Sequence, residues 1–196
     1  MVTLDRSGNR PASKILLSSL LLSLLLGLNA SAEQEIRLDL EENGGLFLPE
    51  GFEAEALVNR LDGQVRHIAV NDNGDVYVKL REAHEDYGNA VLRDTDGDGR
   101  SDDIKYFGKY PIYGRYGTAM RIHKGYLYFS SQKTVYRQKL RSGEMVPESE
   151  LEEIVIDPNE PTAREHVGKP IAFDNEGHLF VSFGAPSNAC QDPKRT

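Results

Sequence analysis

The sequence has no tryptophan and a single cysteine, Cys190, close to its C-terminal end. A lone cysteine leaves no disulfide within the chain, so it either pairs with a cysteine elsewhere or is a buried, inert thiol. The chain also lacks any excess of basic residues, since 23 Lys and Arg stand against 31 Asp and Glu and the net charge is −8. Nucleic-acid phosphates favour proteins with clustered Lys and Arg. We therefore expect no nucleic-acid partner.

Long apolar runs are absent except near the N-terminus, where residues 15–28 read ILLSSLLLSLLLGL. A basic stretch precedes this run and Ala30-Ser31-Ala32 follows it, an order typical of a secretory signal peptide. The run is shorter than the about 20 residues that cross a bilayer. Glu33 rather than a cysteine follows the expected cleavage site, which argues against a lipid anchor. We predict a signal peptide over 1–32 and a periplasmic or secreted mature protein without a stable membrane anchor.

Helical signals are also scarce after the leader, and three segments resemble one another instead. Each has an apolar pair, a polar turn with glycine, and then an alternating strand with an aromatic residue at the same place. Such a unit is a β-hairpin. The three aromatic residues, Tyr77, Tyr128 and Phe180, recur at almost equal spacing. The segments are Arg66–Leu80, Ala119–Gln132 and Pro170–Gly184.

Hairpins that recur about every 50 residues are typical of a β-propeller, in which each blade has four strands. The sequences AVLRD, DIKYF, TVYRQKL and EEIVI supply outer strands for the first two hairpins. The mature length provides for about three blades, whereas propellers close with about four to eight. We therefore predict an all-β chain in which 33–196 is the N-terminal part of a propeller, incomplete at its C-terminus. A single β-sandwich is the alternative.

Five aspartates gather in the sequence DTDGDGRSDD, residues 94–103. Their spacing matches the front of a calcium loop, in which alternate oxygens converge on a hard cation and a glycine permits the turn. The predicted ligands are Asp94, Asp96, Asp98, the carbonyl of Arg100, and Asp102. Lys105 stands where the last, bidentate glutamate of an EF-hand would be, so the complete motif is absent. A solvated β-turn without metal is the alternative, because Asp and Gly are common in turns.

From Arg164 the chain reads REHVGKPIAFDNEGHLFVSFGAPSNACQ, and earlier it reads VLRDTDGDGRSDDIKYFG, YGTAMRIHKGYLYFSSQKTVYRQKL and EEIVI. In this order the strings resemble the quinoprotein glucose and sorbosone dehydrogenases, most closely the L-sorbosone dehydrogenase-like proteins. The resemblance covers about residues 47–193. It implies a six-bladed propeller that oxidises a sugar or sugar aldehyde with pyrroloquinoline quinone (PQQ) and calcium. It also implies an electron acceptor in the periplasm.

The resemblance also assigns roles to individual residues. His166 matches the histidine that takes the proton of the substrate hydroxyl while hydride passes to the quinone, a role that suits imidazole near neutral pH. Arg66 matches a basic position that pairs with a carboxylate, and Gln64, Lys169 and Asn188 are further candidates for cofactor binding. For His166 the alternative is a loop histidine bonded to backbone. For Arg66 and Lys169 it is an ordinary surface base.

The sequence departs from the family in two ways that affect the expected activity. Ala185 follows Gly184 where the glucose dehydrogenases carry an aspartate, although the sorbosone branch shares the alanine. Most of the family's cofactor contacts lie in later blades, as does a cysteine that would pair with Cys190. Two alternatives to a dehydrogenase therefore stay open. They are a non-catalytic, calcium-stabilised propeller that serves as a binding module, and an inactive truncated fragment.

Overall fold

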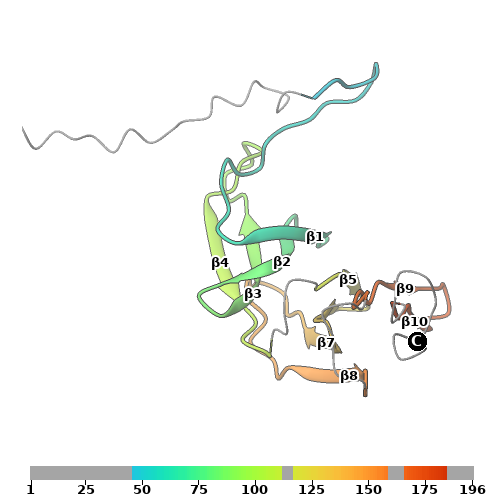
Figure 1. Ribbon diagram of the computed structural model, residues 1–196. Helices are drawn as coiled ribbons and strands as arrows, with labels where there is room; N and C mark the ends of the chain where they lie inside the picture. The colour runs from blue at the N-terminus through green and yellow to red at the C-terminus, as the bar shows by residue number, and fades with distance from the viewer. Residues whose placement is uncertain (1–45, 112–116, 159–165, 185–196) are drawn as a thin grey trace, which may run out of the picture. The chain divides into compact units, whose positions relative to one another are not determined.

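The computed structural model describes residues 46–111, 117–158 and 166–184 (Figure 1). The chain divides into two units, 1–39 and 40–196, and all described strands belong to the second. The predicted signal peptide therefore lies outside the described residues. Within the described ranges, no helix is long and apolar enough to span a membrane.

The first sheet, called sheet 1 below, has four antiparallel strands in the order β1-β2-β3-β4 (Figure 1). The predicted first hairpin forms its inner pair. The backbone N–H of Gly74 donates to the carbonyl of Asn71 at the tip, where Gly74 adopts a φ of 90°, a conformation that favours glycine. The strands are β1 (Gln64–Val70), β2 (Val76–His84), β3 (Tyr87–Arg93) and β4 (Asp103–Phe107).

Sheet 2 repeats this arrangement with the order β5-β6-β7-β8, and a third, two-stranded hairpin follows it. Val135 and Val155 pair across the outer strands of sheet 2. The two outer strands predicted for each of the first two hairpins are therefore confirmed. The strands are β5 (Met120–His123), β6 (Tyr126–Ser130), β7 (Thr134–Lys139), β8 (Glu152–Ile156), β9 (Ile171–Phe173) and β10 (Leu179–Val181).

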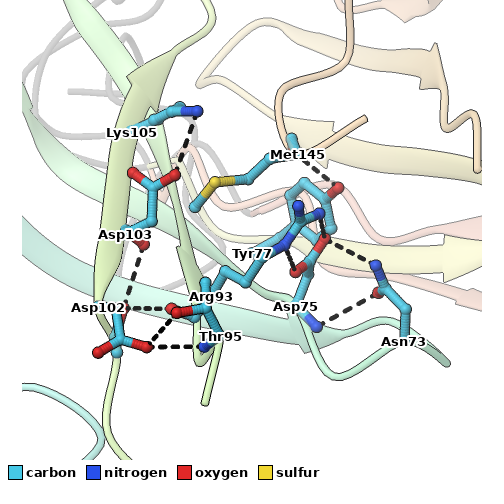
Figure 2. Close-up of polar contacts among 10 residues, drawn as sticks. Asn73, Asp75, Tyr77, Arg93, Thr95, Asp102, Asp103, Lys105 and Met145 are labelled. Carbon is cyan, nitrogen blue, oxygen red and sulfur yellow. Dashed lines mark hydrogen bonds and ion pairs between the residues drawn. The ribbon is translucent and has the colours of Figure 1, made fainter. Parts of the chain in front are cut away.

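An apolar core joins sheet 1 to sheet 2. Alternation along β2 places Tyr77 on one face of the strand and Val78 on the other. Tyr77 packs with residues of sheet 2 and is 1% exposed, and its hydroxyl donates a hydrogen bond to the carbonyl of Met145 at 2.9 Å (Figure 2). The core consists of Tyr77, Val91, Phe107, Tyr110, Met120, Leu127, Phe129, Tyr136 and Met145.

A second core joins sheet 2 to the β9–β10 hairpin. Tyr128 of β6 contacts the edge of the Phe173 ring, with ring centroids 4.7 Å apart, and Ile171 is buried beside it. Sheet 2 is thus apolar on both faces, because each face packs against another sheet. This is the stacking expected of neighbouring propeller blades.

The opposite face of sheet 1 carries a third apolar cluster, with Val78, Leu80, Ala90 and Leu92 at its centre. The segment that precedes β1 covers part of this face through Leu57, Val58 and Leu61. The backbone N–H of Ser101 donates to the carbonyl of Leu57 at 2.8 Å, which fixes the segment beside the aspartate loop.

The predicted all-β class and the four-stranded antiparallel sheets are confirmed. The closed ring and its number of blades remain predictions, since the described residues form two full sheets and one hairpin.

Candidate functional site

His166 lies five residues before Ile171, the first residue of β9, and is exposed. The chain immediately after it turns inward, since Val167 and Lys169 are buried. Two side chains of sheet 2 bind the backbone of Lys169: its N–H donates to Oγ1 of Thr118 at 2.6 Å, and its carbonyl accepts from Oγ of Ser130 at 3.2 Å. The segment between His166 and β9 is therefore held on sheet 2 by specific hydrogen bonds.

Gly184 packs against the backbone of His166. A Cβ atom built on Gly184 would overlap the carbonyl oxygen of His166, so no residue other than glycine fits this position without displacing the histidine. Gly184 begins the GAPSNACQ string that carried much of the family resemblance. The close contact gives this glycine a physical role, which is to let the chain after β10 pass next to the chain before β9.

Lys169 is 2% exposed, and its side chain is already engaged. Its Nζ lies 2.9 Å from Oδ2 of Asp157 and 5.1 Å from the centroid of the Phe183 ring. The role predicted for Lys169 in cofactor binding stays a prediction. In this structure its ammonium neutralises a carboxylate that follows β8 and thereby ties β9 to sheet 2.

Arg66 and Gln64 are exposed on β1, the first strand of sheet 1. The pairing of β1 with β2 is irregular at Gln64, Val65 and His67, which is the signature of a β-bulge. Bulges redirect side chains, so the local irregularity determines where Arg66 points. Asn188, the remaining predicted cofactor ligand, lies outside the described residues.

The structure groups Arg66 with three further residues, His67, Lys79 and Arg121. The sequence had not assigned these three to a site. His67 is half-buried on β1, and burial lowers the pKa of its imidazole below the usual 6.5, assisted by the positive charges of Arg66, Arg121 and Lys79. Arg121 comes from β5, the first strand of sheet 2, which contacts β1. We call Arg66, His67, Lys79 and Arg121 the basic cluster. It favours an anionic ligand over a cationic one.

Lys79 forms the buried end of the basic cluster and is 1% exposed. Its Nζ donates to the carbonyls of Leu80 at 2.6 Å and Gly88 at 3.0 Å, and burial lowers its pKa to about 7. Carbonyls solvate an ammonium incompletely, which is why desolvation dominates. Sequence offered a signal for this burial, because the alternation of VYVKL places Lys79 on the same face as Tyr77, toward the core.

The aspartate loop follows β3 and forms a compact turn. Asp94 accepts hydrogen bonds from the backbone N–H groups of Gly97 at 2.7 Å and Gly99 at 2.9 Å, and these bonds hold the pKa of its carboxyl below the usual value. Asp102 accepts from both the backbone N–H and the hydroxyl of Thr95, which lowers its pKa as well (Figure 2). Both carboxylates are therefore held ionised and in place.

The structure brings together three of the predicted metal ligands. Oxygens of Asp94, Asp96 and Asp102 lie within 4.8 Å of one another. Calcium binds carboxylate oxygens at about 2.3–2.6 Å, so two ligands of one ion are at most about 5 Å apart. The donor set and its spacing thus fit a calcium ion.

Asp98 does not join this group. The carbonyl of Arg100 stays a predicted ligand. The carboxylate of Asp98 accepts a hydrogen bond from the backbone N–H of Arg100 at 2.7 Å and caps the turn. Asp103, the next acid along the chain, forms an ion pair with Lys105 at 3.2 Å (Figure 2). The carboxylate set supported by geometry is therefore Asp94, Asp96 and Asp102.

Comparison with solved structures identifies proteins of the same fold. The holo form of the PQQ domain of pyranose dehydrogenase from Coprinopsis cinerea superposes with a TM-score of 0.52 at 14% identity, over 64% of this chain and 29% of that chain. An iodide structure of Trichoderma reesei Carbohydrate-Active Enzymes Family AA12 gives a TM-score of 0.54 at 18% identity, over 70% of this chain and 34% of that chain.

A calcium structure of the same Trichoderma reesei family also gives 0.54, at 19% identity over 70% of this chain and 33% of that chain. No protein-family model and no curated protein matches the sequence. The chain spans about a third of the length of the solved structures it matches. At these identities the likeness establishes a shared fold with proteins that include a PQQ domain.

Proposed function

We propose that this chain is part of an exported, PQQ-dependent oxidoreductase that oxidises a sugar or sugar aldehyde of the sorbosone or aldose type. The observation that carries the proposal is the placement of His166: an exposed imidazole on a backbone fixed by sheet 2 and Gly184. The shared fold with a PQQ-domain structure supports the choice of cofactor. The GAPSNACQ and aspartate-loop strings support the assignment to the sorbosone branch.

His166 serves as the general base in this proposal. The quinone, when bound, supplies the hydride acceptor. A nitrogen of the His166 imidazole takes the hydroxyl proton of the substrate, so that the carbonyl of the product forms as the C–H bond gives up its hydride. Packing of His166 against Gly184 limits movement of the base, and a fixed base lowers the cost of reaching the reactive geometry.

Arg66 and Arg121 carry the charge of the basic cluster that would hold an anionic quinone, because burial lowers the pKa of both His67 and Lys79. PQQ carries carboxylates, and guanidinium groups bind carboxylates with paired hydrogen bonds. We assign this role to Arg66 and add Arg121, because it contributes positive charge at the same place from the neighbouring sheet. Gln64 and Asn188 stay candidates for the same contact.

We assign calcium a structural role at Asp94, Asp96 and Asp102. The ion would reduce the repulsion among three carboxylates between β3 and β4 and stiffen the outer half of sheet 1. Export with cleavage near Ala32 places the protein in the periplasm or outside the cell, where an electron acceptor would reoxidise the quinone.

The proposal is tested by quinone-dependent dye reduction with the whole protein that contains this chain, PQQ and calcium chloride, with D-glucose and L-sorbosone as substrates. His166→Asn is expected to lower kcat by at least about 100-fold, the usual contribution of a general base. His178→Asn is the matched control, because His178 is exposed but bonded to Asp174 in the β9–β10 turn. Equal rates for the wild type and His166→Asn, or no dye reduction by the whole protein that contains this chain, would refute the proposal.

The second candidate is a non-catalytic, calcium-stabilised binding module. It is favoured by the ion pair of Lys169 with Asp157, because this pair removes one predicted cofactor contact. Thermal denaturation separates the two candidates. The binding module predicts a rise in Tm with calcium and none with PQQ, whereas the oxidoreductase predicts a rise with both.

A further inference from the structure

The segment that precedes β1 lies across the face of sheet 1 opposite the core that it shares with sheet 2. Leu57, Val58 and Leu61 pack there on the third apolar cluster. At the end of the segment next to β1, the backbone N–H of Asp62 donates a hydrogen bond to the hydroxyl oxygen of Tyr106 on β4, at 2.9 Å. We call residues 55–62 the strap, because they are fastened to sheet 1 and cover part of its apolar face.

The other end of the strap is fastened to the aspartate loop. The backbone N–H of Ser101 donates to the carbonyl of Leu57 at 2.8 Å. Ser101 immediately precedes Asp102, whose carboxylate belongs to the three-carboxylate group that fits calcium. The hydroxyl of Ser101 donates to the carbonyl of Asp103 at 3.1 Å. The direction of the Ser101 N–H therefore depends on the conformation of the same loop that would hold the ion.

Glu55 brings a further negative charge against this loop. A Cβ atom built on Gly99 would lie 2.5 Å from Oε2 of Glu55, so this carboxylate rests on the backbone of the loop. Glu53 and Asp98 line the cleft between the same segment and the loop, together with Arg100. Like charges at short range repel one another, and this repulsion opposes docking of the strap. A divalent cation held by the loop reduces the repulsion, so calcium favours the docked strap.

We propose that calcium binding at the aspartate loop and docking of the strap on sheet 1 are coupled, so that each strengthens the other. Two contacts carry the coupling: the hydrogen bond from Ser101 to Leu57, and the carboxylate of Glu55 against Gly99. Such coupling is reciprocal, so calcium tightens the docking by the same factor by which the docked strap raises the affinity for calcium. Removal of calcium therefore loosens the strap and uncovers the third apolar cluster of sheet 1.

This coupling rests on the calcium site of the proposed function and involves neither the quinone nor His166. Dye reduction therefore tests the enzyme and leaves the strap aside. Calcium that raises the Tm without tightening the strap would refute the coupling and leave the calcium site intact. Failure of calcium to bind would refute the calcium site and the coupling together.

The first experiment measures backbone hydrogen exchange of the whole protein that contains this chain, in calcium chloride and in EDTA. The informative amide is that of Asp62, because it is bonded to β4 rather than to the aspartate loop. We expect it to exchange at least about 5-fold faster in EDTA, the lower end of typical coupling between sites. The control amide is that of Gly88, which donates to the carbonyl of Gly108 at the far end of the β3–β4 pair and should not change. Equal exchange of Asp62 in the two solutions, or an equal change at Gly88, would overturn the coupling.

The second experiment measures the reverse effect, by isothermal titration of calcium chloride into the same protein. Leu61→Ala weakens docking of the strap and leaves every residue of the aspartate loop in place, so we expect the Kd for calcium to rise by about 5-fold. Ile156→Ala is the matched control, because Ile156 is an exposed apolar residue on β8 of sheet 2. An unchanged Kd in Leu61→Ala would contradict the coupling, since reciprocity requires the affinity to fall.

The third experiment tests the charge of Glu55. Glu55→Gln removes the repulsion and keeps the size of the side chain, so the Asp62 amide should exchange more slowly in EDTA than it does in the wild type. Glu150→Gln, at an exposed acid shortly before β8, should leave the rate unchanged. If Glu55→Gln exchanges as fast as the wild type in EDTA, charge does not link the loop to the strap and the coupling is wrong as proposed.

Discussion

Arg93 donates two hydrogen bonds to the carboxylate of Asp75, from Nε to Oδ1 at 2.6 Å and from Nη2 to Oδ2 at 2.7 Å (Figure 2). Asp75 is 1% exposed and sits at the start of β2, whereas Arg93 ends β3. Nδ2 of Asn73 also donates to Asp75. The pair joins the inner hairpin of sheet 1 to the strand that leads into the aspartate loop.

Asp75→Asn is expected to destabilise the protein by about 3 kcal/mol, since it leaves a guanidinium without its buried partner. Burial raises the pKa of Asp75, but the hydrogen bonds from Arg93 and Asn73 outweigh it and the net pKa is lowered. The stabilisation is therefore present above pH 3.8, the ordinary value, and is lost as the pH falls through the folded-state pKa. Urea denaturation at pH 7 and at lower pH measures both effects.

The control for this variant is Glu152→Gln. Glu152 pairs with Arg137 at 2.7 Å, but the two side chains are 44% and 34% exposed. An exposed pair contributes less than about 1 kcal/mol. If both variants lose the same free energy of unfolding, burial of Asp75 does not determine how much the Asp75–Arg93 pair contributes to stability.

Calcium is expected to raise the Tm of the wild type, because an ion that binds only the folded state stabilises it by about 2.7 kcal/mol at 100 times its Kd. Asp96→Asn should abolish this rise, since Asp96 belongs to the three-carboxylate group. Asp98→Asn should retain it, because Asp98 lies outside that group. Thermal denaturation in calcium chloride and in EDTA makes the comparison. If neither variant shows an increase in Tm with calcium, Asp98 is a calcium ligand as well.

Lys79 is expected to make stability depend on pH. Its pKa falls from 10.5 to about 7 on folding, so between these values the unfolded chain binds one more proton than the folded one. Stability must then rise with pH over this window, by up to about 1.4 kcal/mol per unit. Urea midpoints from pH 7 to 9 should show this rise in the wild type.

Lys79→Met should remove the slope, and Lys139→Met should keep it because Lys139 is exposed at the end of β7. Measurements stay below pH 10 because Tyr77, whose pKa burial raises to about 12, acts in the opposite direction above that value. A flat profile for the wild type would mean that Lys79 keeps its charge when buried.

Gly184→Ala is expected to displace His166, because the added methyl would overlap its carbonyl oxygen. Hydrogen exchange of the backbone amides at the start of β9 should become faster. Quinone-dependent activity should also fall, as it does in His166→Asn. Gly168→Ala is the control in the same segment, since its Cβ would lie 3.5 Å from Thr118, an ordinary contact. Unchanged exchange in Gly184→Ala would show that the backbone of His166 accommodates a side chain there.

Local periodicity was sufficient to predict most of the strands. The alternation in VYVKL and YLYFS and the Gly turns between hairpin strands are local signals, and each corresponds to an observed strand or turn. The outer strands β4 and β8 were also predictable, because DIKYF contains Ile, Tyr and Phe and EEIVI contains Ile and Val, residue types that favour strands. The packing of sheet on sheet was indicated only indirectly, by the aromatic residue that recurs in each hairpin.

The candidate site was less predictable, because it depends on contacts between residues distant in the chain. The pairing of Lys169 with Asp157, and the approach of Arg121 to His67 from another sheet, have no local signature. The aspartate loop was predicted as a calcium motif, but spacing alone could not separate Asp98 from Asp96. Both carboxylates accept a hydrogen bond from the N–H two residues on, and only the position of Asp96 beside Asp94 and Asp102 separates them.

The most direct test of the proposed function is a single turnover of the quinone on the whole protein that contains this chain. That protein is mixed with calcium chloride and one equivalent of PQQ under anaerobic conditions, and the quinone spectrum is followed after D-glucose or L-sorbosone is added. The proposed function predicts stoichiometric reduction of the bound quinone by at least one of these sugars, slowed at least about 100-fold by His166→Asn. Failure of PQQ to bind to the whole protein, or equal reduction rates in the wild type and His166→Asn, would contradict it.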